Sequence, residues 1–213
     1  MMTILLSDAG KRFNRDWIFR HLSYHFEEKQ SYAIIGPNGS GKSTLLQVLS
    51  GSMQLSDGDI RYWPGGMEDT TRHQQYSTEE IYQRVSICAP YLEVVEEMTL
   101  LEFLSFHQNF KPFLSGITIE KIVSTVDLGN AVNKQIRNFS SGMKQRVKLA
   151  QCIFSDSALV LLDEPCTNLD SAGIDLYHRL IDEHCKNRLV IVSSNDEVEY
   201  RHCKEKINIK DYK

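Results

Sequence analysis

The sequence predicts an α/β fold with a mostly parallel sheet. Residues 158–162 form a continuous apolar run, and residues 189–193 form another, as expected of strands whose two faces are both covered by helices. A third apolar run, at 32–35, leads through a glycine-rich loop into a helix-like segment at 45–49. Strands that alternate with loops and helices in this way are typical of parallel-sheet proteins.

The N-terminal region is expected to consist mainly of strands, because its apolar residues come in short runs separated by turn-forming residues. Residues 14–16 are turn-prone, and a polar stretch opens with Pro64, Gly65 and Gly66. We expect strands at 3–6, 18–26, 31–35, 58–63 and 85–89, and a loop at 64–80.

Three segments with helical spacing of apolar residues follow one another in the middle of the chain. They cover residues 99–110, 118–127 and 141–154. Because they interrupt the alternation of strands and helices, they predict a helical sub-domain at about 91–155. The chain 1–213 is then a single domain whose core consists of residues 1–90 and 156–213.

The core is expected to resume with the strand at 158–162 and to end on an edge strand at 206–209. Helices are predicted at 174–184 and 196–203. We expect His178 and His184 to lie exposed on the first of these two helices.

The composition is that of a globular protein, and it predicts no nucleic-acid partner. Of 213 residues, 41% are hydrophobic and 24% charged, and the formal net charge is −4, so no basic field attracts nucleic acid. The five cysteines show no C-x-x-C spacing, which favours reduced thiols over zinc or disulfides. No run of about 18 apolar residues occurs, so any membrane role is expected to come through a partner.

The glycine-rich loop after the strand at 31–35 has the pattern G-x-x-x-x-G-K-S, in the strand–loop–helix setting that a phosphate-binding loop requires. Its backbone N–H groups are expected to converge on phosphate oxygens, with the lysine on the β- and γ-phosphates and the serine hydroxyl on Mg²⁺. The pattern therefore predicts a site for a nucleoside triphosphate. The residues expected to bind it are Gly36, Pro37, Asn38, Gly39, Ser40, Gly41, Lys42, Ser43 and Thr44.

Two carboxylates, Asp163 and Glu164, follow the apolar strand at 158–162. This position corresponds to the carboxyl edge of a parallel sheet, where ligands bind in open α/β proteins. We expect Asp163 to hold Mg²⁺ through water, together with Ser43. Glu164 is expected to polarise the water that attacks the γ-phosphorus.

With these motifs in order along the chain, the sequence resembles the ATPase subunits of ABC (ATP-binding-cassette) transporters. The segment Phe139-Ser140-Ser141-Gly142-Met143-Lys144-Gln145 stands where the family has its L-S-G-G-Q signature, and Asn168-Leu169-Asp170 resembles its D-loop. Phe13 lies where the family stacks an aromatic ring on adenine. The resemblance covers essentially the whole chain and implies a RecA-like P-loop core, a signature-bearing helical sub-domain, and ATP with Mg²⁺ as ligands.

The resemblance also implies partners. In the family, the signature of one subunit faces the γ-phosphate held by another, so that two nucleotides lie between two cassettes arranged head to tail. Ser140, Ser141 and Gly142 would make this contact here, at the start of a helix whose N-terminus favours anions. Whether the second cassette is a copy of this chain or a different one stays open.

The chain departs from the family at several positions. Ser141 replaces a glycine of the signature and Met143 replaces its glutamine. Pro90 stands where the family has a glutamine that touches Mg²⁺ and the attacking water. Asn195 stands where it has a histidine that contacts the γ-phosphate, so Asn195 joins Lys42 as a candidate catalytic contact. We expect nucleotide and Mg²⁺ binding to persist, and hydrolysis to be slow.

The leading interpretation is the energy subunit of a transporter that docks on a membrane-spanning permease through residues 91–101. In its compact size, the chain resembles the cassettes of export systems, including the haem-exporter-like branch. Such a subunit is cytoplasmic, held on the inner face of the membrane through its partner. Two alternatives remain. The first is a soluble ABC protein of the translation or chromosome-maintenance type, which the absence of sustained heptads disfavours. The second is a small-molecule kinase.

Overall fold

The computed structural model describes residues 1–65 and 75–213. These residues divide into two compact units. The core unit comprises Met1–Ile87, Ser157–Glu164 and Lys186–Lys213, and the helical unit comprises Cys88–Asp156 and Pro165–Cys185. The sequence placed residues 165–185 in the core, whereas their contacts group them with the helical unit. Part of the loop expected at 64–80 falls on residues 66–74, outside the described ranges.

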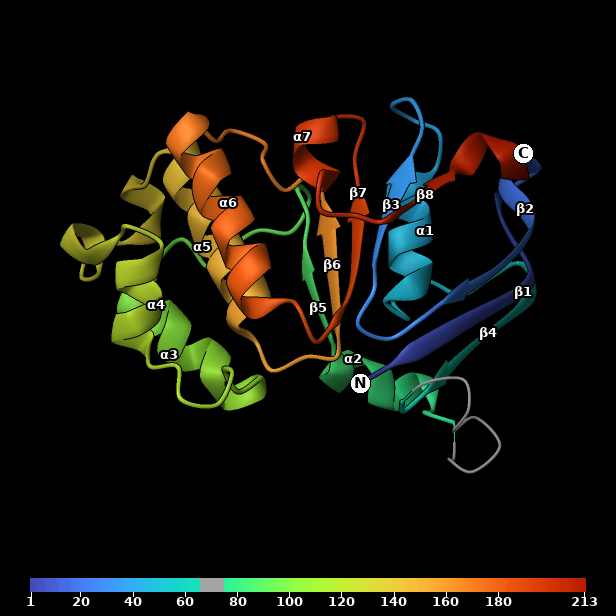
Figure 1. Cartoon of the computed structure of the whole chain (residues 1–213). Helices are drawn as coiled ribbons and strands as arrows, with labels where there is room; N and C mark the ends of the chain where they lie inside the picture. The colour runs from blue at the N-terminus through green and yellow to red at the C-terminus, as the bar shows by residue number, and fades with distance from the viewer. Residues whose placement is uncertain (66–74) are drawn as a thin grey trace. The chain divides into compact units, whose positions relative to one another are not determined.

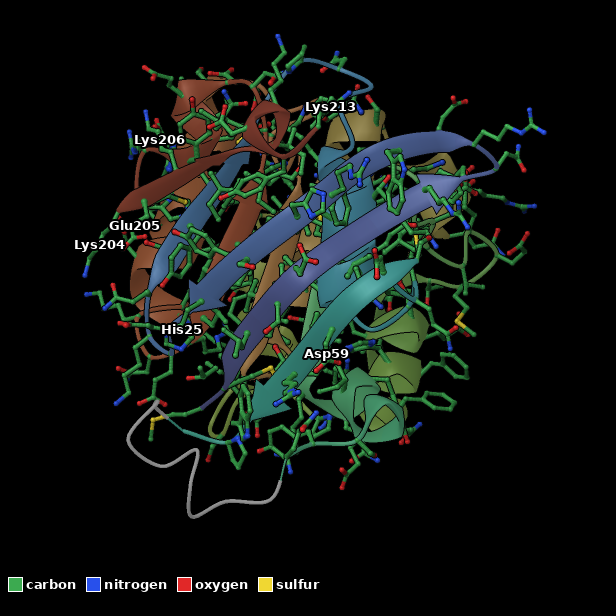
Figure 2. The ribbon with its side chains drawn as sticks, turned by 90° about the vertical axis from the view of Figure 1, so that its right-hand side faces the viewer. His25, Asp59, Lys204, Glu205, Lys206 and Lys213 are labelled. Carbon is green, nitrogen blue, oxygen red and sulfur yellow. The ribbon has the colours of Figure 1, made fainter. Side chains whose placement is uncertain are left out.

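The core unit contains a three-stranded antiparallel sheet in the order β2-β1-β4. Its strands are β1 (Thr3–Phe13), β2 (Asp16–Phe26) and β4 (Asp57–Trp63). Asn14 has a φ of 54°, the left-handed conformation that a tight hairpin turn requires and that asparagine tolerates. Both β1 and β2 extend to this turn and are longer than expected. Figure 2 shows the three strands side by side, with His25 near the end of β2 and Asp59 on β4.

A five-stranded sheet in the order β5-β6-β7-β3-β8 forms the other sheet of the core unit. Strand β3 pairs in parallel with β7 and with β8, and β6 pairs in parallel with β7, so these four strands end at one edge of the sheet. The expected edge strand near the C-terminus is confirmed as β8. The strands are β3 (Ser31–Ile35), β5 (Val85–Cys88), β6 (Leu159–Asp163), β7 (Leu189–Ser193) and β8 (Glu205–Asn208).

Helix α1 (Lys42–Leu49) lies between the two sheets (Figure 1) and supplies the centre of a single apolar core. Burying large apolar side chains from both sheets against one helix contributes most of the stabilisation of such a layered arrangement. The core therefore fixes the start of α1, and with it the loop that precedes this helix. The fully buried members include Ile4, Leu6, Phe19, Leu22, Phe26, Ile34, Leu45, Leu46 and Leu49.

Short helices complete the core unit: α2 (Thr78–Arg84), α7 (Glu197–Tyr200) and the 3₁₀ turn η4 (Ile209–Tyr212). Helix α2 was not expected from the sequence. It begins at a capping box in which the Ser77 N–H donates to Glu80 Oε2 at 2.8 Å. The pattern S-x-x-E at 77–80 could have indicated this helix start.

The helical unit consists of α3 (Leu100–Phe110), α4 (Ile119–Thr125), α5 (Ser141–Phe154) and α6 (Ser171–His184), with 3₁₀ turns η2 (Gly129–Ala131) and η3 (Ile136–Asn138). Helix α5 packs against α6 and against α3. The expectation that His178 is exposed is wrong: it is buried in α6, and its ring lies 5.1 Å from that of Tyr177. Within the described ranges, every helix is too short or too polar to cross a lipid bilayer.

Candidate functional site

The loop between β3 and α1 is shaped by glycines in conformations that other residues rarely adopt. Gly39 has a φ of 75° and Gly41 a φ of 107°. A Cβ at Gly41 would lie 2.3 Å from Cγ2 of Ile18, so this position excludes side chains by contact as well as by conformation. The loop passes directly into α1, whose first N–H groups have no intrahelical acceptor and favour an anion.

The polar side chains of this loop fit a phosphate group. The Lys42 ammonium is buried, with 5% of the residue exposed, and donates to the Gly36 carbonyl at 2.8 Å and the Pro37 carbonyl at 3.3 Å. The Ser40 hydroxyl oxygen is buried and has no hydrogen-bond partner among the described residues. Since buried polar groups are normally satisfied, a buried ammonium and an unsatisfied hydroxyl in one loop indicate an anionic ligand.

A pocket of about 210 Å³ opens over this loop. It brings Glu164 together with the adjacent residues Lys42 and Ser43, which lie far from it in the sequence. It also contains Ile18 of β2, which sequence reasoning missed, because nothing in a half-buried strand position distinguishes it. The lining residues are Ile18, Asn38, Gly39, Gly41, Lys42, Ser43, Thr44 and Glu164.

The two acidic residues after the apolar strand have different environments. Asp163 is the last residue of β6, is 3% exposed, and accepts a hydrogen bond from Ser193 Oγ at 2.7 Å. Glu164 follows it with a φ of 45°, and its N–H donates to the Ser193 carbonyl at 2.9 Å. The left-handed conformation costs about 1–2 kcal/mol for a residue with a side chain. Such strain is typical of functional positions, and here it accompanies a side chain that lines the pocket.

Asn195 lies just beyond β7 and contacts the phosphate-binding loop directly. Its Nδ2 donates to Asn38 Oδ1 at 2.8 Å. The structure thus places Asn195 beside the loop, as the sequence suggested. Its hydrogen-bond partner here is a residue of that loop.

Pro90 occupies a turn in which the Leu92 N–H donates to the Ala89 carbonyl at 3.2 Å. Proline suits the second position of such a turn because its φ is already fixed. Its side chain offers no hydrogen-bonding group, and its carbonyl accepts from Lys148 Nζ at 3.3 Å.

Phe13, the expected adenine contact, ends β1 and is 46% exposed. The Lys11 ammonium lies 5.2 Å from its ring centroid, a cation–π distance. Phe13 does not line the phosphate pocket described above. An exposed ring at a sheet end is available for stacking.

The helical unit contains a second pocket, of about 550 Å³, at the start of α5. Ser140 caps this helix, since its Oγ accepts from the Met143 N–H at 3.2 Å. Ser140, Ser141 and Gly142 line the pocket together with Asn168. The structure thus brings the expected signature and the expected D-loop to one cavity.

Arg146 lines the same pocket and was missed by sequence reasoning. Its guanidinium lies 3.5 Å from Asp127 Oδ2 and 3.7 Å from Asp170 Oδ1. These two carboxylates hold a positive charge beside the N-terminus of α5. Its position four residues after Gly142 could have suggested it, since residues three to four apart share a helix face.

Comparison with known proteins agrees with this geometry. The family model described as "ABC transporter" matches residues 19–167. The Bacillus subtilis uncharacterized ABC transporter ATP-binding protein YhcH is 33% identical over 92% of this chain, which spans 63% of that protein's length. The Streptococcus pyogenes lantibiotic transport ATP-binding protein SrtF is 29% identical, over 89% of this chain and 78% of its own.

A solved structure shows the same fold. The post-hydrolysis dimer of the ATP-binding cassette MJ0796, bound to ADP and Pi, superposes with a TM-score of 0.78 at 18% identity. The superposition covers 98% of this chain and 94% of that one. With a family model that matches most of the sequence, and with P-loop, acidic strand end and signature turn in place, this chain belongs to the ABC transporter family of ATP-binding proteins.

Proposed function

We propose that this protein binds and hydrolyses ATP as the energy subunit of an ABC transporter. The observation that carries the proposal is the pocket in which Lys42, Ser43 and Glu164 line one cavity. A buried ammonium, a hydroxyl and a carboxylate at the end of parallel strands are the groups that phosphoryl transfer to water requires.

Each residue has a distinct role in this proposal. Lys42 and the loop N–H groups bind the phosphates and offset their charge. Ser43 and Asp163 hold Mg²⁺, which when bound neutralises charge that develops on the transferred phosphoryl group. Glu164 orients a water molecule and accepts its proton. Phe13 stacks on the adenine ring.

A second cassette completes the site. The turn Ser140–Gly142 presents a helix N-terminus, and Arg146 adds a fixed positive charge at the same pocket. The helix N-terminus suits the γ-phosphate of a nucleotide held by another cassette, whereas the Arg146 charge is offset by its contacts with Asp127 and Asp170. The dimeric cassette with bound ADP and Pi supports this arrangement by analogy of fold. The partner cassette is a second copy or a related chain.

Hydrolysis is expected to be slow. Pro90 offers no side-chain group to water or Mg²⁺, and Asn195 carries no positive charge. Loss of one transition-state contact costs about 2–4 kcal/mol in enzymes of other kinds. In addition, the Asn195 amide is engaged with Asn38, and nucleotide has to compete with that hydrogen bond.

The helical unit offers a surface for a membrane-spanning permease. Tyr91, Leu92, Val95 and Leu101 are exposed apolar residues within the segment 91–101. Phe106 and Phe110 add a tilted aromatic pair on α3, with ring centroids 4.9 Å apart. Exposed apolar clusters of this kind are typical of protein–protein contacts. Docking there holds the subunit on the cytoplasmic face of the membrane, in a transporter by analogy with the lantibiotic transport relative.

Fewer of the glutamates in this segment are available to contact a permease than the sequence suggested. Glu96 forms an ion pair with Lys144 of α5, within the helical unit. Glu93 and Glu97 remain candidates for contact with basic residues of the permease. Replacing both by glutamine should weaken co-purification with the permease and leave the ATPase rate of the isolated chain unchanged.

Substitution of Glu164 by glutamine tests the hydrolytic role. The amide keeps the size of the side chain and cannot accept a proton, so steady-state turnover should fall by about 10²–10⁴-fold. Affinity for ATP, measured by titration of a fluorescent analogue, should stay within about twofold. Glu183→Gln, at an exposed position of α6, is the matched control and should behave as wild type. Turnover above a tenth of the wild-type rate in Glu164→Gln would remove Glu164 as the base.

A further inference from the structure

The C-terminal end of β7 lies between the two halves of the candidate site. In the sheet order, β7 is the neighbour of β6, which carries Asp163, and of β3, which leads into the phosphate-binding loop. The Ser193 carbonyl accepts from the Glu164 N–H at 2.9 Å, and the Ser194 N–H donates to the Ile34 carbonyl at 3.2 Å. Backbone hydrogen bonds thus tie this strand end to both halves of the site.

The side chain of Ser193 adds a contact that backbone pairing does not require. Its hydroxyl donates to Asp163 Oδ1 at 2.7 Å, and Ser193 itself is 0% exposed. Asp163 and Ser193 are also direct partners in the parallel register of β6 and β7. A hydrogen bond from a buried hydroxyl to a buried carboxylate is short, strong and directional, so it fixes the rotamer of the acid.

We propose that Ser193 is a positioning residue for the metal-binding carboxylate of Asp163. This inference rests on the proposed function, because it takes Asp163 as the residue that holds Mg²⁺. The hydroxyl donates to Oδ1, so the carboxylate would be held in a single orientation when it binds Mg²⁺ or a water of the ion. The action of Ser193 is therefore indirect, through Asp163.

The proposal explains a polar residue in an otherwise apolar strand. The other four residues of β7 are Leu189, Val190, Ile191 and Val192. A fully buried hydroxyl at the last position of such a strand is costly unless it is hydrogen-bonded. Partners in the second layer of metal sites typically contribute about 10–100-fold to metal affinity.

Ser193→Ala is the direct test. The Mg²⁺ concentration for half-maximal turnover should rise by about 10-fold or more. Turnover at saturating Mg²⁺ should fall much less, and ATP affinity in the presence of EDTA should be unchanged. Binding of Mn²⁺ to the protein–ATP complex, followed by electron paramagnetic resonance, gives a readout independent of activity and should weaken by the same factor.

The matched control is Ser86→Ala. Ser86 is also a buried serine of the parallel sheet, and its hydroxyl forms a 2.7 Å hydrogen bond with that of Ser157. Its loss should lower stability without changing the Mg²⁺ requirement. If the Mg²⁺ requirement rises in Ser193→Ala and not in Ser86→Ala, the effect comes from the positioning of Asp163 and not from a general loss of packing.

A second background tests whether Ser193 acts through Asp163. In Asp163→Asn, adding Ser193→Ala should leave the already weakened Mn²⁺ affinity unchanged, because the carboxylate is gone. An additive loss, or an unchanged Mg²⁺ requirement in Ser193→Ala alone, overturns the proposal. If Ser193→Ala does not fold, Ser193→Cys replaces the hydroxyl by a weak donor, and the same Mn²⁺ shift is expected. A wild-type protein that binds no ATP at all would instead overturn the proposed function.

Discussion

Two pockets in the described part of the chain, the phosphate-loop pocket at Lys42 and the signature pocket at Ser140–Gly142, differ in the ligand-binding groups that they supply. The phosphate-loop pocket is lined by a buried ammonium, the Ser43 hydroxyl and a carboxylate from a strained backbone position. The signature pocket is larger and is framed by a helix N-terminus and by an arginine already engaged with two carboxylates. In the proposed function, the first pocket binds the triphosphate, whereas the second receives an anion that another chain presents.

This difference separates two properties of the molecule. Nucleotide binding depends on side chains of the core unit, so a single chain should bind ATP. In the proposed function, hydrolysis involves the signature turn of a second cassette as well, so it should require two cassettes. Variants of the core unit should therefore change nucleotide affinity in the isolated chain, whereas variants of the signature should act only on the assembled pair.

The largest change in affinity is expected from Lys42→Ala. It removes a buried positive charge from the phosphate-binding loop, and a hydrogen bond to a charged group contributes about 1.5–3 kcal/mol, or about 10–100-fold in affinity. Titration with a fluorescent ATP analogue measures the effect. Lys29→Ala, which removes an exposed lysine paired with Glu28, is the control. Equal affinities of the two variants would contradict the assignment of the loop.

A smaller, positive effect is expected from Asn195→His. The histidine restores a side chain able to carry charge near the γ-phosphate and removes the hydrogen bond to Asn38. Steady-state turnover should rise by about 10-fold or more, because one transition-state contact contributes at least about 2 kcal/mol. Asn195→Ala, which removes the amide without adding a charge, should show no such gain. Identical rates in Asn195→His and wild type would show that Asn195 does not limit the chemistry.

The smallest effect concerns acid stability, and it arises in the helical unit. Burial lowers the pKa of His107 from 6.5 to about 4, and the nearby Lys111 charge acts in the same direction. The ring bonds to Ser155 and Gln151 in its neutral form. Because the unfolded chain takes up the proton more readily, this contribution to stability is present above pH 6.5 and is lost as the pH falls toward 4.

His107→Gln tests this pH dependence. The amide can hydrogen-bond but does not titrate, so the urea midpoint should fall less between pH 7 and pH 4 (about the range of the two pKa values) than in wild type. His21→Gln, at an exposed position, should keep the wild-type slope. An unchanged slope in His107→Gln would show that His107 does not govern the acid response.

Much of the core and of its site could be predicted from sequence, because both depend on local patterns. The phosphate-binding loop and the apolar strands ending in Asp163 and Ser193 are defined by contiguous residues with fixed spacing. The structure adds what pairing across the sheet determines. The Ser193–Asp163 and Asn195–Asn38 hydrogen bonds join residues that no local pattern connects. The burial of His178 was missed because α6 belongs with the helical unit.

The most direct test of the account is the nucleotide-dependent association of Glu164→Gln. Sedimentation velocity should show monomers without nucleotide and pairs of cassettes with ATP and Mg²⁺. The pairs should form from this chain alone, or after its permease and any partner cassette are added. Adding Ser141→Asp places a negative charge on an exposed signature residue at the start of α5, and should abolish pairing while ATP affinity is retained. The claim that two cassettes complete the site would be contradicted if Glu164→Gln stayed monomeric under all these conditions while the wild type still hydrolysed ATP at its full rate.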